Sequence, residues 1–268
     1  MHKNLPAFIL LLLIPFCLPA QDILPDTIWN QYDQSGKKYG WWKKNYPDGT
    51  LMYKGFFVDD SPRGTLIRYF ENGEKKAIMH FSQDGKSAFS TLYYMNGELA
   101  AEGKYEGTNK DSTWKYYSYY THTLSLVENY NAGIKNGPSM KYYDNGLVAE
   151  SVDWESNIKQ GKWNQYFEDG SLRLSSYFVN NKLDGPYKVF ASPGKIAMDG
   201  NYNDGKMDGK WTYYNENGII ESELLYENGK ALNDSILDEK SRKFIEELEK
   251  NLGTIPEPDL ENFIPGEN

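Results

Sequence analysis

The sequence predicts an all-β protein: eight β-hairpin repeats of about 24 residues that form one elongated, curled antiparallel meander sheet, followed by an amphipathic capping helix. Two series of small residues with the same period predict this fold. A fixed period of 20 to 50 residues indicates stacked supersecondary units. A small residue opens a unit every 24 residues, with one step of 25, at Gly40, Gly64, Ala88, Ser112, Gly137, Gly161, Gly185 and Gly209. Nine residues into seven of these units lies a second glycine, at Gly49, Gly73, Gly97, Gly146, Gly170, Gly194 and Gly218.

Residues 1–20 have the features of a secretory signal peptide. Lys3 supplies the positive start, residues 5–18 form the apolar stretch, and Ala20 is a small residue suited to cleavage before Gln21. A membrane anchor is the alternative, but the apolar run is shorter than the ~20 residues that span a bilayer, and two prolines interrupt it. We therefore expect an exported protein, either periplasmic or secreted to the cell surface, with no membrane span after cleavage.

The composition of the mature chain narrows the classes of partner. Cleavage removes Lys3, so 28 basic and 38 acidic side chains remain, a net charge of −10. Nucleic acids and anionic membranes select clustered Lys and Arg, so neither is an expected partner. The only cysteine, Cys17, leaves with the signal peptide, and disulfides and thiolate chemistry are not expected.

Residues 21–230 form the predicted repeat domain, and the unit that begins at Gly161 shows its design. Trp163 lies on one face of a strand and Tyr166 on the other, because side chains alternate along a strand. Asn-Gly or Asp-Gly between such strands predicts a type I′ turn, in which both residues have positive φ. Eight units give about sixteen strands, and the sheet is expected to curl until its apolar face is enclosed. Expected members of the buried row are Trp42, Trp114, Trp163 and Trp211.

The apolar period changes after Gly229. Apolar residues then follow a helical spacing, at Ile236, Leu237, Phe244, Ile245 and Leu248, so residues 231–252 are predicted to form an amphipathic helix. Terminal repeats expose apolar ends, and the expected role of the helix is to cap the last hairpin. Recruitment of a partner by this helix is the alternative. Residues 253–268 contain three prolines and are predicted to be irregular.

The repeat unit resembles a known family. Its pattern, Gly-x-Trp-x-x-Tyr-Tyr/Phe-x-Asn/Asp-Gly-x-Leu, is similar to the MORN-repeat variant of YwqK-type antitoxin proteins. The clearest matches are Gly161–Gly170 and Gly209–Gly218, and the resemblance covers about residues 38–230. It implies an all-β repeat sheet that binds other molecules and is not an enzyme. It carries no catalytic residues over to this chain.

The sequence contains no recognisable catalytic or metal-binding motif. His80 and His122, the two histidines of the mature chain, lie in different repeats and in no metal-ligand spacing. No nucleophile elbow, phosphate-binding loop or dinucleotide-binding glycine pattern occurs. We therefore expect no catalytic residue, no bound metal and no cofactor.

Two groups of residues are candidates for recognition. The first is an aromatic row five residues into each unit: Tyr69, Tyr93, Tyr117, Tyr142, Tyr166, Phe190 and Tyr214. It either binds a ligand or only stiffens the sheet by ring contacts. The second is the irregular fourth unit, which lacks the Asn-Gly turn and contains Tyr119, Tyr120 and His122. It is either a recognition loop or an eroded repeat.

The function that fits these features is an exported, non-catalytic scaffold that binds a protein, such as an envelope or secreted protein. The alternative is a carbohydrate or cell-wall glycan binding module that uses the exposed aromatic rows, because rings stack well on sugars.

Overall fold

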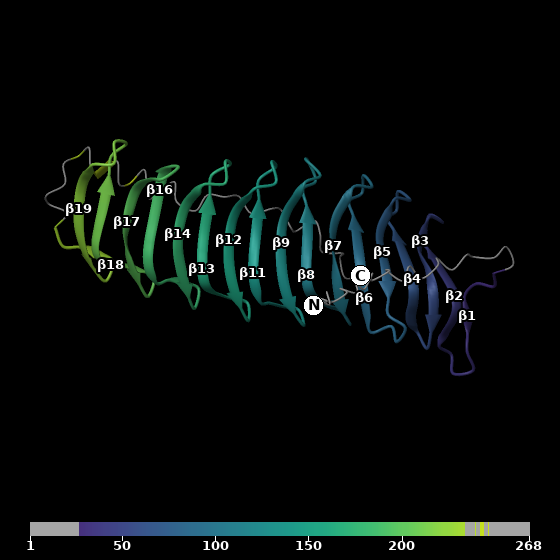
Figure 1. Cartoon of the computed structure of the whole chain (residues 1–268). Coiled ribbons are helices and arrows are strands. Elements are labelled where there is room, and N and C mark those ends of the chain that lie inside the picture. The colour runs from purple at the N-terminus through teal and green to yellow at the C-terminus, as the bar shows by residue number, and fades with distance from the viewer. Residues whose placement is uncertain (1–26, 234–238, 240–241, 244–245, 247–268) are drawn as a thin grey trace, which may run out of the picture.

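The structure is a computed structural model that describes residues 27–233 together with Glu239, Arg242, Lys243 and Glu246. All strands of this part belong to one antiparallel sheet of 20 strands. Figure 1 shows that the strands follow one another in chain order along an elongated sheet. The predicted all-β class and single antiparallel sheet are confirmed, while the count of eight repeats stays a prediction. The predicted signal peptide and the predicted tail, residues 253–268, lie outside the described residues.

Sixteen strands are six to nine residues long, and each pairs with the next long strand along the chain. They are β2 (Lys38–Asn45), β3 (Leu51–Val58), β4 (Ser61–Tyr69), β5 (Lys75–Phe81), β6 (Ser87–Tyr93), β7 (Leu99–Glu106), β8 (Asn109–Tyr117), β9 (Leu124–Asn131), β11 (Gly137–Tyr142), β12 (Val148–Glu155), β13 (Ile158–Tyr166), β14 (Leu172–Val179), β16 (Gly185–Ser192), β17 (Lys195–Asn203), β18 (Lys206–Tyr214) and β19 (Ile220–Glu227).

Four strands are only two residues long and extend neighbouring hairpins. They are β1 (Gln31–Tyr32), β10 (Ile134–Lys135), β15 (Lys182–Leu183) and β20 (Lys230–Ala231), which pair with β2, β9, β14 and β19 respectively.

The strand register divides the side chains into two faces. Residues directly opposite one another in an antiparallel pair share a face. Trp114 lies opposite Glu128, Val152 opposite Trp163, and Trp211 opposite Leu224. We call the face that carries Trp42, Trp114, Trp163 and Trp211 the Trp face. The other face, which carries Asn164 and Tyr166, is the Tyr face.

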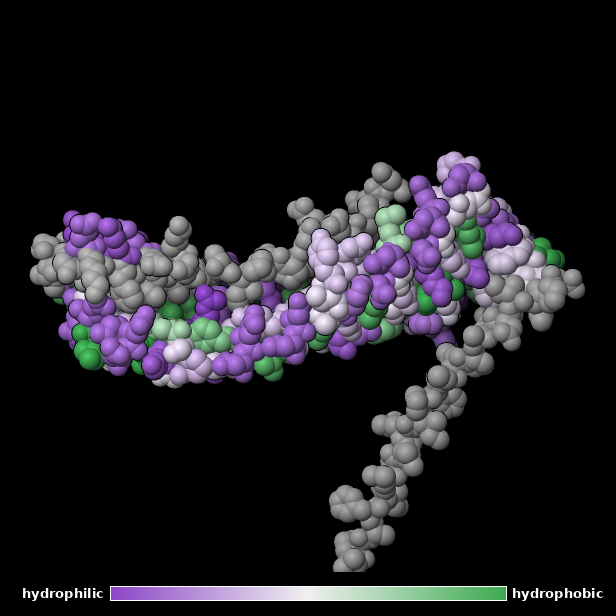
Figure 2. All heavy atoms as spheres, turned by 90° about the horizontal axis from the view of Figure 1, so that it is seen from above, coloured by the Kyte–Doolittle hydropathy of each residue, from purple (hydrophilic) through white to green (hydrophobic). Residues whose placement is uncertain are grey.

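The sheet is open and only slightly curled, so the expectation that curling encloses the apolar face is wrong. Side chains on the Trp face are buried without a second sheet, because large rings lie flat over the backbone of the neighbouring strand. The side chains of Trp114 and Trp211 have no exposed surface. Lysine stems complete the cover: the Lys110 ammonium lies 5.1 Å from the Trp114 ring centre. Figure 2 shows hydrophilic residues along the whole visible length, with small hydrophobic groups between them.

Glycine allows the close approach of each buried tryptophan. A Cβ at Gly103 would lie 2.3 Å from the Trp114 ring, and one at Gly200 would lie 2.2 Å from the Trp211 ring. Each indole donates a hydrogen bond to the backbone carbonyl that follows its glycine, at 2.9 Å for Trp114 and 3.1 Å for Trp211. Because the space over these glycines is filled by a ring, the Trp face needs no second layer there.

The same pairing explains why Trp163 is only half-buried. Val152 lies opposite it, and a valine side chain prevents the ring from resting on the backbone. Trp163 donates instead to Glu150 Oε1 at 2.9 Å, and its ring packs against the C-terminal core cluster. The buried residues form two clusters, one around Trp114 and one around Trp211.

The Asn-Gly and Asp-Gly turns that contain the second glycine of a unit are not of type I′, which corrects the geometry expected there. At Asp48-Gly49 only the glycine has positive φ, Gly49 N–H donates to the Tyr46 carbonyl, and Tyr46 N–H donates to the Thr50 carbonyl. This is a type I turn followed by a left-handed glycine, which forms a bulge. The Asp48 side chain accepts from Thr50 N–H at 2.9 Å, which favours this geometry. The second glycines of all seven units have positive φ.

Type I′ turns occur at the opposite end of the hairpins. Both residues of Asp59-Asp60, Asn180-Asn181 and Asp204-Gly205 have positive φ. The residues that open the units adopt the same backbone region, including Ser112 at φ 59°, which supports its equivalence to the glycines. Ala88 is the exception.

The predicted capping helix, residues 231–252, falls mostly outside the described residues. Glu239, Arg242, Lys243 and Glu246 are helical and exposed, and Lys243 Nζ lies 2.8 Å from the Glu239 carboxylate. The helix as a whole and its capping role stay predictions. Among the residues that the structure describes, no helix is long and apolar enough to cross a membrane.

Candidate functional site

The aromatic row of the Tyr face lies at one end of the hairpins. Each member directly follows a register shift at the end of its strand. All seven rings are half-buried: Tyr69, Tyr93, Tyr117, Tyr142, Tyr166, Phe190 and Tyr214. The row is therefore accessible in part, and its role in binding stays a prediction.

Tyrosines one residue further along the chain connect neighbouring hairpins. Tyr46, Tyr94 and Tyr143 each donate a hydrogen bond of 2.7–2.8 Å to the backbone carbonyl 23 residues later. The acceptors are the carbonyls of Tyr69, Tyr117 and Tyr166. These bonds fix the backbone beneath the aromatic row, so the rings are held on a rigid edge of the sheet.

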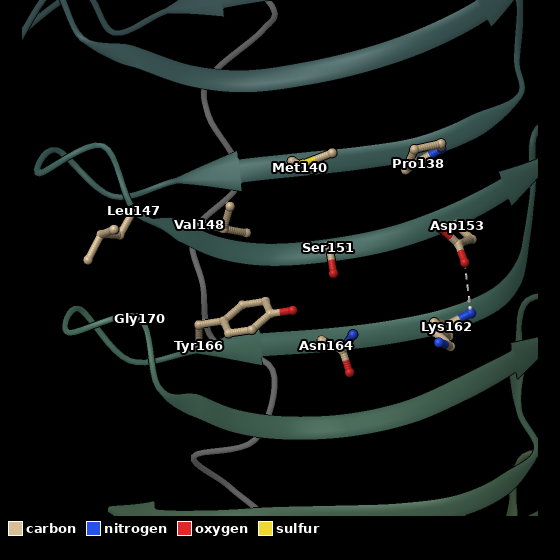
Figure 3. Close-up of a pocket in the computed structure, with 10 residues that line it drawn as sticks. All are labelled: Pro138, Met140, Leu147, Val148, Ser151, Asp153, Lys162, Asn164, Tyr166 and Gly170. Carbon is tan, nitrogen blue, oxygen red and sulfur yellow. Dashed lines mark hydrogen bonds between the residues drawn. The ribbon is translucent and has the colours of Figure 1, made fainter. Parts of the chain in front are cut away.

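A shallow hollow of about 540 Å³ lies on the Tyr face of β11, β12 and β13. Tyr166, Leu147 and Val148 line one end, and Asp153 and Lys162 line the other (Figure 3). Ser151, Asn164, Met140, Pro138 and Gly170 complete the lining. The Asp153 carboxylate accepts a hydrogen bond of 3.1 Å from the Lys162 backbone N–H, which fixes it at the rim.

The same strands carry a fully paired polar network on the Trp face. Glu150 accepts from the Trp163 indole at 2.9 Å and lies 3.0 Å from Lys141 Nζ, and Gln165 contacts it at 3.3 Å. Burial opposes ionisation of Glu150, but the bonds from Trp163 and Lys141 outweigh it and lower the pKa of the carboxyl. Here the polar groups stabilise one another and the face is structural.

A second buried network lies on the Trp face around Lys110. Its ammonium donates to the Tyr116 hydroxyl at 2.7 Å and lies 5.3 Å from the Tyr130 ring centre. Tyr130 donates to Glu128, which is only 3% exposed and pairs with Lys135. Burial lowers the pKa of Lys110 and raises those of Tyr116 and Tyr130. Since each group has a partner inside the network, its role is to hold neighbouring hairpins together.

The irregular loop of the fourth unit projects from the turn edge between β8 and β9. Tyr119 packs on Tyr94 of the preceding hairpin, with ring centres 4.9 Å apart, and His122 Nδ1 lies 3.7 Å from Glu98. Thr121 donates to Asp144 of the following hairpin at 3.0 Å. Tyr120 is 87% exposed. The loop is thus anchored on both sides and presents one highly exposed ring, Tyr120, which contacts the Tyr119 ring edge-on. Its role in recognition stays a prediction.

One aromatic cluster was not predicted from the sequence. Trp29, Tyr39, Trp41 and Phe56 contact one another at the N-terminal end of the Tyr face, with ring centres 5.7–6.5 Å apart. Tyr39 is 51% exposed. The signal was available, since Trp41 precedes Trp42 and must therefore lie on the opposite face of its strand.

The other predicted residues take structural places. Trp42, Trp114 and Trp211 are buried, and the seven turn glycines have left-handed backbone. His80 Nδ1 lies 3.1 Å from the Thr65 hydroxyl. In the described part of the chain, no group of three or more His, Cys, Asp or Glu side chains could hold a metal ion.

Comparison with known families gives a match near the C-terminal end of the sheet. A family model described as MORN repeat variant matches residues 207–228, which comprise nearly all of β18 and the whole of β19. The match supports a MORN-repeat character for this hairpin. Comparison with curated proteins gave no match.

Proposed function

We propose that the mature chain is an exported, non-catalytic repeat scaffold that binds a protein partner through the Tyr face of its sheet. The observation that carries the proposal is the succession of accessible rings along one open sheet, from the Trp29 cluster to Tyr214. Tyr and Trp are the side chains most enriched among residues that dominate binding energy at interfaces. The proposal includes cleavage after Ala20, eight hairpin repeats and kinship with YwqK-type proteins.

The size of the sheet supports a protein as the ligand. Sixteen long strands spaced by about 4.8 Å span roughly 70 Å, and eight residues of strand span about 26 Å. The face therefore offers on the order of 1,800 Å², about twice the 800 Å² that each partner buries in a standard interface. Elongated repeat proteins use such surfaces for binding. The MORN-repeat match supports the non-catalytic part, because this repeat is generally a binding or structural module.

The test compares three baits made from residues 21–268 in extracts of the cell envelope. The first is the unchanged protein, and the second carries Tyr69→Ala, Tyr93→Ala and Tyr142→Ala on the Tyr face. The third, a matched control, carries Glu→Gln changes at three exposed turn positions, Glu71, Glu168 and Glu216.

The unchanged protein and the turn control should recover the same defined protein, and the Tyr-face variant should recover at least tenfold less. Equal recovery by all three baits, or recovery of no defined protein, would contradict the proposal. Thermal unfolding of each bait must show an intact fold.

A second candidate function is glycan binding. The observation that favours it is the hollow around Tyr166, where an aromatic ring lies beside polar side chains on an open surface. Binding of the mature protein to purified oligosaccharides would establish this function independently of any protein partner.

A further inference from the structure

Two short polar side chains, Ser151 and Asn164, lie in the middle row of the Tyr face and line the hollow. The register places Ser151 opposite Asn164, and Asn164 opposite Ser175. In the corresponding row near Tyr69 the residues are Ile67 and Ile78, which lie opposite each other. Near Tyr214 they are Thr212 and Glu223. At the hairpin of Tyr69 this row is therefore filled by larger, apolar side chains.

The polar groups of the hollow are free to bind a ligand. In the described part of the chain, the side chains of Ser151, Lys162, Asn164 and Tyr166 make no hydrogen bond or ion pair, whereas those of Trp163 and Gln165 on the other face of β13 are paired. A hydroxyl, an amide, an ammonium and a phenol together can both donate and accept. Four such groups around one depression match a ligand that carries many hydroxyls.

The ring of Tyr166 supplies the apolar part of the surface. Figure 3 shows the ring at one end of the hollow, with its hydroxyl directed along the strands toward the side of Ser151 and Asn164. The backbone of Tyr166 is fixed by the hydrogen bond from Tyr143, at 2.7 Å. An aromatic face held in place beside hydrogen-bonding groups is suited to the apolar face of a sugar ring.

The charge of the site favours an uncharged ligand. Asp153 and Lys162 contribute one negative and one positive charge at the same rim, and the remaining lining residues are neutral. The mature protein is strongly acidic, which disfavours anionic polysaccharides. The volume of about 540 Å³ lies within the roughly 300–1,000 Å³ of small-molecule sites.

We propose that this hollow is a binding site for one sugar ring of an uncharged glycan, with Tyr166 as the stacking platform and Ser151, Asn164 and Lys162 as hydrogen-bonding groups. The proposal rests on the second candidate function and assigns it to one place on the sheet. It is separate from the protein-binding proposal.

The test titrates the mature chain, residues 21–268, with two uncharged tetrasaccharides, tetra-N-acetylchitotetraose and cellotetraose, and with anionic tetragalacturonate. Isothermal titration and saturation-transfer NMR measure binding. Tyr166→Ala removes the ring, Asn164→Ala removes one polar group, and Ser151→Leu fills the hollow. Tyr69→Ala is the matched control, because Tyr69 holds the same place in its unit beside two isoleucines.

At least one uncharged tetrasaccharide should bind saturably. Tyr166→Ala and Ser151→Leu should each weaken it by about tenfold or more, Asn164→Ala by about three- to tenfold, and Tyr69→Ala by less than about twofold. In the unchanged protein, nuclear Overhauser contacts should join the sugar C–H protons to the Tyr166 ring, which tests the site even where a variant fails to fold.

Three outcomes would overturn the proposal, and they can be told apart. Absence of saturable binding by both uncharged tetrasaccharides would remove the glycan function together with the site. Binding that survives Ser151→Leu, or that Tyr69→Ala weakens as much as Tyr166→Ala, would leave the function and remove the site. Tighter binding of tetragalacturonate would show that the ligand is anionic.

Discussion

Gly200→Ala should destabilise this protein, although the same change in an unconstrained strand is favourable. Gly200 has an ordinary backbone conformation that alanine adopts freely, so no strain in φ is involved. Its new Cβ would lie 2.2 Å from the Trp211 ring, which is fully buried and flanked by Tyr213 and Leu224. Because the clash is with a rigid ring, Trp211 must tilt outward, as Trp163 does opposite Val152.

The magnitude follows from what the tilt removes. If about a fifth of the roughly 250 Å² of the indole becomes exposed, the loss is about 1.3 kcal/mol at 25 cal/mol per Å². The hydrogen bond from the Trp211 indole to the Asn201 carbonyl, 3.1 Å long, is also lost, at about 1 kcal/mol. Alanine in place of glycine in a strand raises the unfolding free energy by about 0.5–1 kcal/mol, which offsets part of this loss. The net destabilisation is about 1.5 kcal/mol.

Urea unfolding followed by far-ultraviolet circular dichroism measures this change. With a denaturant slope of about 2 kcal/mol per M, the midpoint should fall by about 0.7 M. The control is the same substitution in a Trp211→Tyr background. Ser176 already lies beside Tyr187 in the continuing register of β14 and β16, and both are at most 3% exposed, so a Cβ is accommodated opposite tyrosine. There Gly200→Ala should be neutral or stabilising.

Two results would refute this reasoning. A higher urea midpoint for Gly200→Ala alone would show that the ring adapts without loss. An equal destabilisation in both backgrounds would show that the effect does not act through Trp211. Hydrogen exchange adds a spatial check, because amides of β18 and β19 should lose protection while those of β8 keep it, since repeats communicate with their neighbours.

Four further predictions follow from the same structure. Trp211→Ala should lower the unfolding free energy by about 3–5 kcal/mol, while Tyr166→Ala, at a half-buried ring, should lower it by less than about 1 kcal/mol in urea titrations; equal losses would mean that both faces are core. The fold lowers the pKa of Glu150, so its ionised form stabilises the protein at pH values above the ordinary pKa of 4.5, and this contribution disappears as the pH falls through the folded-state pKa. Glu150→Gln should therefore lower the unfolding free energy at pH 7 and much less at pH 3. An equal effect at both pH values would contradict the charge argument. Tyr120→Ala should reduce binding of the protein partner and leave the melting temperature within about 2 °C, because the ring is 87% exposed. Unchanged partner binding, or a large fall in melting temperature, would contradict a role of this loop in recognition. Amino-terminal sequencing of the protein from the producing cell should begin at Gln21, and a chain that begins at Met1 would remove the export proposal.

The hairpins could be predicted from the sequence because their turns require particular residues. Gly49 and its equivalents adopt a backbone region that few other residues occupy, so their spacing marks each turn. The turn type could not be read from the same residues. Asn-Gly fits both a type I′ turn and a type I turn with a left-handed glycine, and the choice depends on which flanking residues pair, such as Tyr46 with Thr50.

The prediction that the apolar face is enclosed by curling was wrong, because side-chain alternation does not show how that face is buried. A period of two shows which side chains share a face, but not that Gly103 lies beneath Trp114 or that Val152 faces Trp163. Burial within a single layer depends on these volumes in neighbouring strands. The hollow at Ser151 is similar, because its short residues Ser151 and Asn164 lie on two strands that only the register aligns.

The pairing of volumes across hairpins also limits how such a chain can gain or lose repeats during evolution. Each unit contributes a large or a small residue to the boundary with the next: Gly55 under Leu66, Met79 beside Ser90, Gly103 under Trp114, Gly200 under Trp211. Deletion of one unit, residues 64–87, would place Gly55 opposite Ser90 and leave a void in the Trp face. Deletion of residues 185–208 would place Ser176 opposite Trp211, which is a smaller mismatch in volume than the void of the first deletion. The units have one period but are not interchangeable, so changes in repeat number should be tolerated best at boundaries whose side chains already have compatible volumes.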